Sequence, residues 1–514
     1  MGQFEKRLDA LQPVLAGGLQ RGIEKESLRV RADGRLAVTP HSGELGAALT
    51  HPHITTDFSE VQLELITGVH ASARACLEEL THIHQFVYRH IEDELLWSGS
   101  MPCDLPDEQA IPIARFGRSN RGRAKEVYRT GLSYRYGRRM QLISGVHYNF
   151  SVPERAWPIA DLRNTNEGYF ALIRNFRRHA WLLLYLFGAS PAVCASFVAG
   201  RPHELEEFAP GTLYLPHATS LRMGRLGYLS AAQDALAVSY NDLPSYAASL
   251  QHALTEPYAP YEQIGIRDGD GYRQLATTLL QIENEFYSTI RPKRVIRSGE
   301  RPLRALVERG VQYVEVRAMD LDPFSDTGIS AQTARFLDVF LLHCLLSDSP
   351  RDTPEEIAMV NRNKHRVAAR GREPGLHLDR VGGSVKLGDW CEQLLSELEP
   401  IATAVDAAQD TGEHRDALDA AAARIANPDT LPAARVLDEM RLRHGGSYSR
   451  FALERSREHR RSILARSWPP ESEARFRDLA QASLARQTVI EDEDDVPFET
   501  YRQRYLSPDS LRAR

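Results

Sequence analysis

Alternation of apolar and polar residues predicts several β-strands that carry polar side chains on one face. In the first, residues 21–30, Glu24 and Glu26 share one face and Ile23 points the opposite way, towards a core. Side chains two positions apart on a strand lie roughly 7 Å from each other. Such a pair of carboxylates suits a metal cluster. Ordinary charges on a solvent-facing strand are the alternative interpretation of this stretch.

The same alternation recurs at residues 60–66, 145–152 and 313–317. The polar faces of these segments carry Glu60, Gln62, Glu64, His147, Asn149, Ser151, Tyr313, Glu315 and Arg317. Asp57 stands an odd number of positions before Glu64, so it can join this face only from a loop or at a β-bulge. An antiparallel sheet with these acids on one face would be electrostatically unfavourable unless cations neutralised it. Oxygen-rich sites with little sulfur favour Mg²⁺ or Mn²⁺ over zinc.

Longer segments have the spacing of helices, which together with the antiparallel sheet predicts an α+β fold. Residues 180–200 carry no charge and are long enough on paper to span a membrane. Gly188, Ser190 and Pro191 interrupt this stretch near its middle. We therefore interpret it as a buried helix that ends at Phe187, followed by a tight turn and a buried strand. From residue 388 onwards helical spacing prevails, and we expect a helical layer packed on a catalytic core of residues 1–387.

Composition describes an ordinary globular chain of 514 residues with 42% hydrophobic and 26% charged residues. The net charge of -6 gives no overall basic field that would imply nucleic acid or an anionic membrane as a partner. The cysteines lie far apart, without a C-x-x-C pair, which argues against a disulfide framework or a structural zinc site. No apolar signal-peptide core follows Met1. We expect a cytoplasmic protein.

A cluster of basic residues between Arg115 and Arg139 contains nine Lys and Arg residues against the single acid Glu126. Interleaved aromatic residues would suit single-stranded nucleic acid, although no named nucleic-acid motif accompanies them. Small anions such as nucleotide phosphates or carboxylates need the same chemistry on a smaller scale. A solvated helical face is the third interpretation. The acidic run at residues 491–495 is interpreted as a solvated or mobile segment.

Several runs in this order resemble the proteobacterial glutamate–cysteine ligase family. They are RGIEKESLRV at 21–30, ITTDF at 54–58, SGVHYNFS at 144–151, LFGASP at 186–191 and IRPKR at 290–294. The resemblance covers most of the chain from about residue 19 to about residue 326. It implies an antiparallel sheet like that of glutamine synthetase, curved into a funnel with magnesium ions at its base and surrounded by helices. It also implies ATP-dependent formation of γ-glutamylcysteine, the first step of glutathione biosynthesis.

The resemblance assigns roles position by position. The metal ligands implied are Glu24, Glu26, Asp57, Glu64, His147 and Glu315, all matched in residue type. The implied cysteine pocket is Tyr128, Arg222, Tyr228 and Tyr287. Arg317 and the cluster Arg291, Lys293 and Arg294 would face phosphate or the glutamate carboxylate. Arg317 and Glu315 are the expected catalytic residues.

The implied chemistry explains these residue types. The γ-carboxylate of glutamate attacks the terminal phosphorus of ATP, and divalent ions offset the repulsion between the two anions. The cysteine amine then displaces phosphate. Two alternatives stay open: a related carboxylate–amine ligase that uses another amine, and a non-catalytic relative that binds nucleotide or metal. We expect a monomer that acts on L-glutamate, L-cysteine and ATP, with Mg²⁺ or Mn²⁺ as cofactor and no nucleic-acid or membrane partner.

Overall fold

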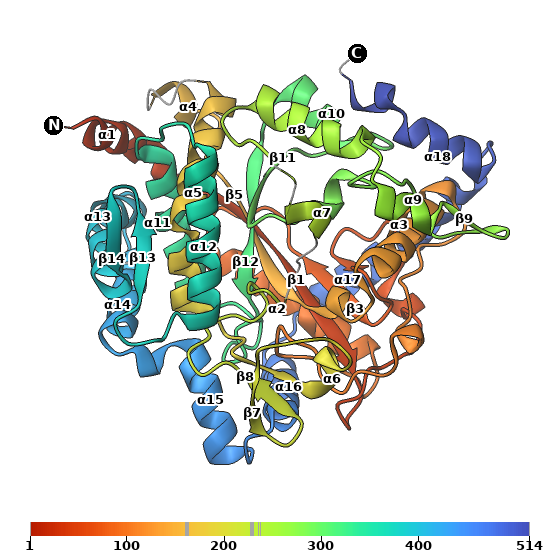
Figure 1. The fold of residues 1–514 in the computed structure, drawn as a ribbon, viewed down its shortest axis with the longest axis horizontal. Helices are drawn as coiled ribbons and strands as arrows, with labels where there is room; N and C mark the ends of the chain where they lie inside the picture. Colours follow the sequence, from red (N-terminus) through yellow and green to blue (C-terminus); the bar gives the residue numbers. More distant parts are fainter. Residues whose placement is uncertain (1, 160–163, 227–230, 235, 237, 513–514) are drawn as a thin grey trace.

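A seven-stranded sheet, antiparallel at every pairing, runs through the centre of the protein (Figure 1). The computed structural model describes residues 2–159, 164–226, 231–234, 236 and 238–512. The strand order is β11-β12-β5-β1-β3-β2, and β4 pairs with β1. The strands of this sheet are β1 (Gln20–Val30), β2 (Ile54–Thr56), β3 (Gln62–Ile66), β4 (Leu95–Leu96), β5 (Gly145–Ser151), β11 (Ile290–Lys293) and β12 (Tyr313–Asp320).

The structure confirms the strands predicted from alternation, which correspond to β1, β3, β5 and β12. Their register aligns the polar positions across neighbouring strands. Glu24 of β1 lies opposite His147 of β5, and Glu26 of β1 lies opposite Glu64 of β3. Directly opposite residues share a face of the sheet. The acids that the sequence placed on separate strands therefore form one continuous polar face.

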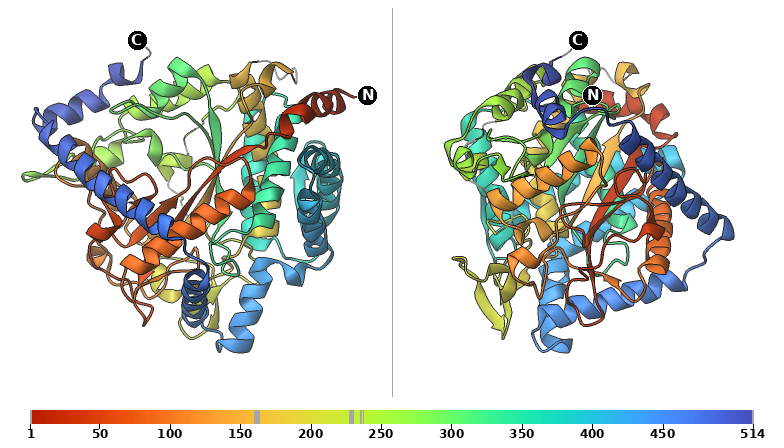
Figure 2. Two further views of the ribbon diagram at one scale, coloured as in Figure 1. Left: turned by 180° about the vertical axis from the view of Figure 1, so that it is seen from behind. Right: turned by 90° about the vertical axis from the view of Figure 1, so that its right-hand side faces the viewer.

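Helices surround the sheet (Figure 1). They include α1 (Gln3–Leu15), α2 (Ala73–His90), α3 (Asn120–Tyr136), α5 (Thr165–Phe187), α8 (Leu243–Thr255), α10 (Pro302–Arg309), α11 (Ala331–Leu346), α12 (Pro354–Arg370), α13 (Leu387–Gln409), α14 (Glu413–Ala426), α15 (Pro432–Arg443), α16 (Tyr448–Ala465), α17 (Pro470–Asp492) and α18 (Phe498–Leu506). Apolar side chains of the sheet, of α2, α5 and α11, and of α13 and α14 belong to one buried core. Helices α2 and α17 lie side by side on the back of the molecule (Figure 2).

Shorter elements connect this framework. The short helices are α4 (Ala156–Ile159), α6 (Ala195–Val198), α7 (Ala231–Asp234) and α9 (Ala259–Ile264). The remaining strands form small sheets: β6 (Ala192–Cys194), β7 (Glu206–Ala209) and β8 (Thr212–Tyr214), then β9 (Arg267–Asp268) with β10 (Gly271–Tyr272), and β13 (His377–Arg380) with β14 (Gly383–Lys386).

The uncharged stretch at residues 180–200 folds as predicted. Helix α5 ends at Phe187, a turn follows, and β6 is fully buried. Leu182 and Leu186 of α5 are buried in the main core, where they contact protein side chains. In the described part of the chain, no helix combines the length and apolar character needed to cross a bilayer.

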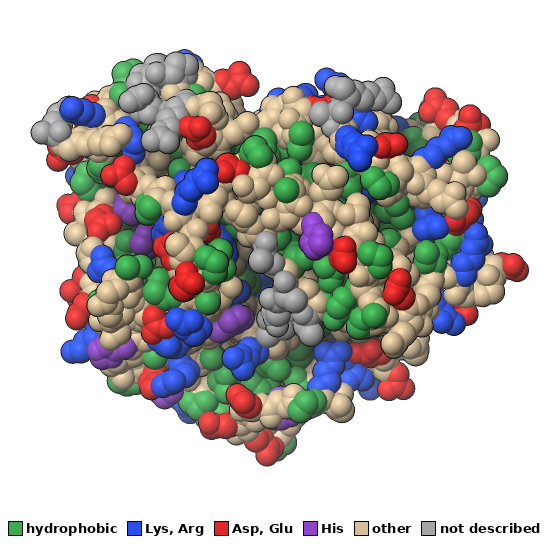
Figure 3. All heavy atoms as spheres, turned by 45° about the horizontal axis from the view of Figure 1, so that its top comes forward, with side chains coloured by type: hydrophobic (Ala, Val, Ile, Leu, Met, Phe, Trp, Pro, Cys, Tyr) green, Lys and Arg blue, Asp and Glu red, His purple; other side chains and the backbone are tan. Residues whose placement is uncertain are grey.

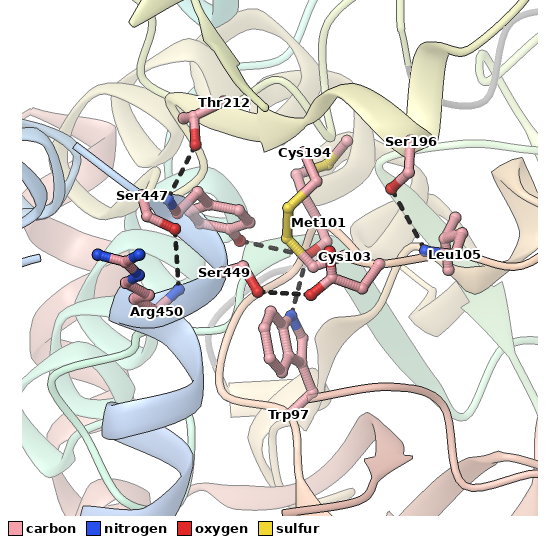
Figure 4. Close-up of a disulfide and its surroundings, with 12 residues drawn as sticks. Trp97, Met101, Cys103, Leu105, Cys194, Ser196, Thr212, Ser447, Ser449 and Arg450 are labelled. Atoms are coloured by element: carbon pink, nitrogen blue, oxygen red, sulfur yellow. Dashed lines mark hydrogen bonds between the residues drawn. A yellow bond between two sulfur atoms is a disulfide. The ribbon is translucent and has the colours of Figure 1, made fainter. Parts of the chain in front are cut away.

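One pair of cysteines contradicts the sequence prediction. Cys103 and Cys194 form a disulfide that joins the loop after β4 to the end of β6, with the Cα atoms 5.2 Å apart (Figure 4). The loop is also held by Trp97, whose Nε1 donates to the carbonyl of Met101 at 3.0 Å. The sequence argued against a disulfide framework, and it did not reveal this single disulfide because 91 positions separate the two cysteines. Cys76, Cys344 and Cys391 are free and buried.

The surface shown in Figure 3 carries Lys and Arg side chains interspersed with Asp and Glu. This mixture agrees with the small net charge of -6. The basic cluster of the sequence lies mainly on α3, whose side chains do not share one environment. Arg135 is buried and its Nη1 lies 2.8 Å from Glu285 Oε1, whereas Arg138 donates to the carbonyl of Ile111 at 2.7 Å. The solvated-face interpretation is therefore wrong for Arg135.

Candidate active site

Carboxylates from several strands converge on His147 at the polar face of the sheet. His147 Nδ1 lies 3.2 Å from Glu24 Oε2 and 3.8 Å from Glu315 Oε1. On the other side of the ring, His147 Nε2 lies 3.5 Å from Glu26 Oε1. Glu24, Glu64 and His147 each offer a ligand atom within 4.8 Å of the others. Glu26 and Glu315 are buried, which rules out the interpretation of solvent-facing charges.

Asp57 reaches the same cavity from the turn between β2 and β3. This is the loop position that its odd spacing from Glu64 required. The backbone carbonyl of Asp57 accepts a hydrogen bond from Arg129 Nε, which ties the turn to α3. The cavity therefore contains all of the predicted metal ligands.

The carboxylates influence one another's ionisation because they are buried together. Burial, and then the neighbouring charges of Glu24 and Asp57, raises the pKa of Glu64 well above its usual value. Burial would likewise raise the pKa of Glu315, but Lys293 and Arg317 outweigh it and hold that pKa well below the usual value. Some carboxylates of this cluster resist ionisation because they repel one another, and a bound cation would stabilise their ionised form.

The donor set is the kind that binds a divalent cation. It offers carboxylate oxygens from Glu24, Glu26 and Glu64 and one imidazole nitrogen, and the described residues that line the cavity include no cysteine. Glu315 Oε2 is buried without a hydrogen-bond partner among the described residues. This oxygen forms an ion pair with Arg317 Nη1 at 3.4 Å but no hydrogen bond. Such an oxygen-rich set fits Mg²⁺ or Mn²⁺.

The predicted basic residues lie in different environments. Lys293 Nζ and Arg317 Nη1 each lie 3.4 Å from an oxygen of Glu315, at the edge of the acidic cluster. Arg291 lines the same cavity, but its Nη2 donates to the carbonyls of Asn284 and Phe286. Arg294 lies outside this cavity and donates to backbone carbonyls at the end of α10. Lys293 and Arg317 are thus the basic residues nearest the acids.

A cavity of about 370 Å³ lies between the polar face of the sheet and α3. Residues that sequence reasoning did not assign complete its wall: Arg121, Lys125, Arg129, Gln141, Tyr501 and Tyr505. The α3 residues are spaced four apart and share one helix face. That spacing was present in the basic cluster and is the signal that could have identified them. Their placement favours the small-anion interpretation of the cluster.

A smaller cavity of about 80 Å³ adjoins the first and is also lined by His147, Tyr287 and Arg317. Arg222 forms part of its wall and is 3% exposed. Tyr287 donates from its hydroxyl to Gln141 Oε1 at 3.0 Å. Tyr128 lines the larger cavity, and Tyr228 lies outside the described residues. The described members of the predicted cysteine pocket therefore lie on both sides of His147.

A third cavity, of about 1310 Å³, opens at the opposite end of the strands and also contains Glu24. Its wall includes exposed apolar side chains, with Val69 74% and Val295 65% exposed. Trp157 and Arg294 lie in the same wall. Exposed valines beside an aromatic ring provide an apolar surface for a planar ligand.

Comparison with known proteins identifies relatives over nearly the whole chain. A family model described as glutamate-cysteine ligase matches residues 7–367. A glutamate–cysteine ligase of Azotobacter vinelandii is 51% identical over 98% of both chains, and one of Pseudomonas paraeruginosa is 50% identical over 94% of this chain and 93% of its own. A crystal structure of glutamate–cysteine ligase from Francisella tularensis in complex with AMP matches with a TM-score of 0.90 and 37% identity, covering 95% of this chain and 97% of that one.

Proposed function

Because this chain belongs to the glutamate–cysteine ligase family, we propose that it joins the γ-carboxylate of L-glutamate to the amino group of L-cysteine while ATP is converted to ADP and phosphate. The observation that carries the proposal is the buried cluster of carboxylates around His147, bordered by Lys293 and Arg317 in one cavity. Such a site can hold a phosphorylated nucleotide and a carboxylate together, which is what activation of a carboxylate requires.

Glu24, Glu26, Asp57, Glu64, His147 and Glu315 would hold the metal. A bound Mg²⁺ or Mn²⁺ supplies positive charge that offsets the repulsion between the ATP phosphates and the γ-carboxylate. The residues around it keep their own roles. Lys293 and Arg317 point towards Glu315, where they neutralise negative charge that develops on the transferred phosphoryl group. Arg317 and Glu315 are the catalytic residues we propose.

The reaction proceeds in two steps. In the first, a γ-carboxylate oxygen of glutamate attacks the terminal phosphorus of ATP, and the bond from that phosphorus to the ADP oxygen breaks. In the second, the cysteine nitrogen attacks the γ-carbonyl carbon, the bond from carbon to phosphate oxygen breaks, and the amine loses a proton.

The three cavities divide the substrates between them. The α3 wall with Lys125 and Arg129 suits the α-carboxylate of glutamate, because cationic side chains bind carboxylates by charge-assisted hydrogen bonds. Tyr128, Arg222, Tyr228 and Tyr287 would receive cysteine. The large cavity at the other end of the strands suits the nucleoside of ATP, since it contains Glu24 and an apolar wall. The AMP complex of the Francisella tularensis enzyme supports an adenine nucleotide as ligand.

Further parts of the proposal concern the setting of the site. We propose that the sheet curves into a funnel around the acidic cluster and that residues 388–514 act as a helical layer on a core of residues 1–387. We also propose that the chain acts as a monomer in the cytoplasm on small-molecule substrates.

Phosphate release tests the proposed function. The purified protein is incubated with ATP, Mg²⁺ and L-glutamate, and phosphate is measured with L-cysteine or with other amines added one at a time. Release that depends on cysteine supports the proposal. Release that depends on a different amine identifies a related carboxylate–amine ligase. Nucleotide binding without release in any mixture identifies a non-catalytic relative.

A further inference from the structure

The LFGASP run forms a buried hydrogen-bonded site for one carboxylate, that of Asp320 at the end of β12. Ser190 Oγ donates to Asp320 Oδ2 at 2.6 Å, and the Ala189 backbone N–H donates to the same oxygen at 2.9 Å. Ser220 Oγ donates to the other carboxylate oxygen, Oδ1, at 2.9 Å. Asp320 is 5% exposed, and both serines are fully buried. Three donors from two segments therefore fix the orientation of this carboxylate.

The fixed carboxylate lies beside the guanidinium of Arg222. Asp320 Oδ1 is 3.9 Å from Arg222 Nη1, an ionic contact that is longer than a hydrogen bond. Arg222 Nη2 donates to the carbonyl of Arg317 at 3.0 Å, and Arg222 Nε is buried without a hydrogen-bond partner among the described residues. The aspartate thus provides a counter-charge for Arg222, which lines the smaller cavity.

On its other side, the guanidinium of Arg222 packs closely against the backbone of Gly145. A Cβ atom added at Gly145 would lie 2.2 Å from Arg222 Nη2 and 2.5 Å from Cζ. Only glycine leaves space for a guanidinium packed flat on the start of β5. Gly145 also donates its backbone N–H to Glu26 Oε2 at 2.8 Å, which links this placement to the acidic cluster.

We propose that Asp320 is a positioning residue for Arg222 and thereby determines the preference for an amine substrate that carries an α-carboxylate. The inference rests on the proposed function, in which Arg222 binds the carboxylate of cysteine. Asp320, Ser190 and Ser220 hold the guanidinium of Arg222 against Gly145, in the wall of the smaller cavity where the incoming carboxylate would bind. A rigid, oriented guanidinium distinguishes a substrate with a carboxylate from one without it, because an unmet buried donor is costly.

Comparison of two amines tests this role. L-Cysteine and cysteamine both carry a thiol and an amine, but cysteamine lacks the carboxylate. The ratio of kcat/KM for cysteine to kcat/KM for cysteamine is measured by phosphate release with saturating ATP and glutamate. We expect Asp320→Asn to lower this ratio about tenfold or more, the scale of one charge-assisted hydrogen bond. Ser190→Ala removes one neutral donor, and we expect a fall of about threefold.

A matched control separates positioning from a general loss of stability. Asp338 is also a fully buried aspartate, but it bonds Arg21 and Tyr148 on the opposite face of the sheet. Asp338→Asn should change thermal stability and leave the ratio of the two amines unchanged. If Asp320→Asn does not fold, Ser190→Ala and Gly145→Ala decide the question, and each should lower the ratio.

The outcomes distinguish two failures. A wild-type protein that shows no preference for cysteine over cysteamine would refute both the proposed amine pocket and this inference. A wild-type preference that persists in Asp320→Asn and Ser190→Ala would refute the positioning role alone. A ratio that falls equally in Asp338→Asn would also refute it, because the effect would then follow from lost stability.

Discussion

Replacement of Glu315 by glutamine removes one charge from the centre of the site and changes its shape little. The side chain is buried and lies 3.4 Å from both Lys293 and Arg317. Breaking a fully buried ion pair costs about 3–5 kcal/mol. Here solvent screens the partners, since the side chains of Lys293 and Arg317 are 32% and 21% exposed. Relief of repulsion from Glu24 offsets part of the remainder, so we expect a loss of about 1–2 kcal/mol.

Activity should respond much more strongly than stability. Glu315 is one of the proposed metal ligands, and it also sets the position of Lys293 and Arg317 beside the phosphoryl group. Loss of groups that merely support a metal ligand costs about 10–100-fold in affinity or activity. We therefore expect Glu315→Gln to lower kcat/KM by at least about a hundredfold while Tm falls by no more than about 4 °C.

The assay measures cysteine-dependent phosphate release over a range of Mg²⁺ concentrations, with thermal unfolding recorded on the same samples. Glu397→Gln is the control, because Glu397 hydrogen-bonds His343 at 3.1 Å, far from the cavity residues in the fold, and should retain activity. Near-normal turnover of Glu315→Gln at saturating Mg²⁺ would show that Glu315 neither binds the metal nor organises the basic residues.

Three further predictions concern other regions. Lys125→Met should raise KM for glutamate about tenfold, and an equal rise in KM for ATP in initial-rate measurements would contradict the assignment of the α3 wall. Burial would raise the pKa of Glu79, but hydrogen bonds from Arg475 and further donors lower this pKa to about 2. The ionised Glu79 therefore stabilises the folded protein at neutral pH, and this contribution is lost as the pH falls below about 4. Urea unfolding should show Glu79→Gln about 2 kcal/mol less stable at pH 7, with the difference shrinking towards pH 3; a difference independent of pH would contradict this. Glu491 accepts a hydrogen bond from the Arg118 backbone N–H at 2.7 Å, just before α3. Glu491→Ala should therefore raise KM for glutamate two- to threefold, and Glu491→Gln, which keeps an acceptor, should leave KM near the wild-type value. An equal rise in KM in both variants would show that this hydrogen bond has no role.

Periodicity was sufficient to predict the polar face of the sheet. A β-strand puts every second side chain on the same face, and the apolar side chains mark the face that is buried. The remaining side chains therefore form the polar face. Glu24, Glu26, Glu64, His147 and Glu315 were therefore placed correctly relative to their own strands. Periodicity does not give the order of strands in the sheet, which decides that β5 and β3 flank β1. The family resemblance implied that these residues bind shared metal ions, but the strand order itself was not predicted.

Contacts between distant segments were not predictable from the sequence. The acidic run at residues 491–495 was interpreted as solvated, yet Glu491 and Asp494 accept backbone N–H groups of Arg118 and Asn120. Tyr501 and Tyr505 of α18 line the cavity although more than 180 positions separate them from Arg317. No local pattern marks such residues, because the fold alone brings α18 to the cavity. The division of the chain at residue 387 stays a prediction.

Contacts on the helix-covered face of β1 fix the register of this strand and so the position of its acidic side chains. Arg21 and Lys25 alternate with the acids and point towards the helices, where each is at most 3% exposed. Arg21 Nη2 lies 2.8 Å from Asp338 of α11, and Lys25 Nζ lies 2.8 Å from His84 of α2. A shift of β1 by one residue would move Arg21 and Lys25 to the opposite face and separate them from Asp338 and His84. The same shift would bury the acids among apolar side chains, where an unpaired charge costs several kcal/mol. The register of β1 is therefore fixed by contacts on both of its faces, so that the carboxylates meet around one point.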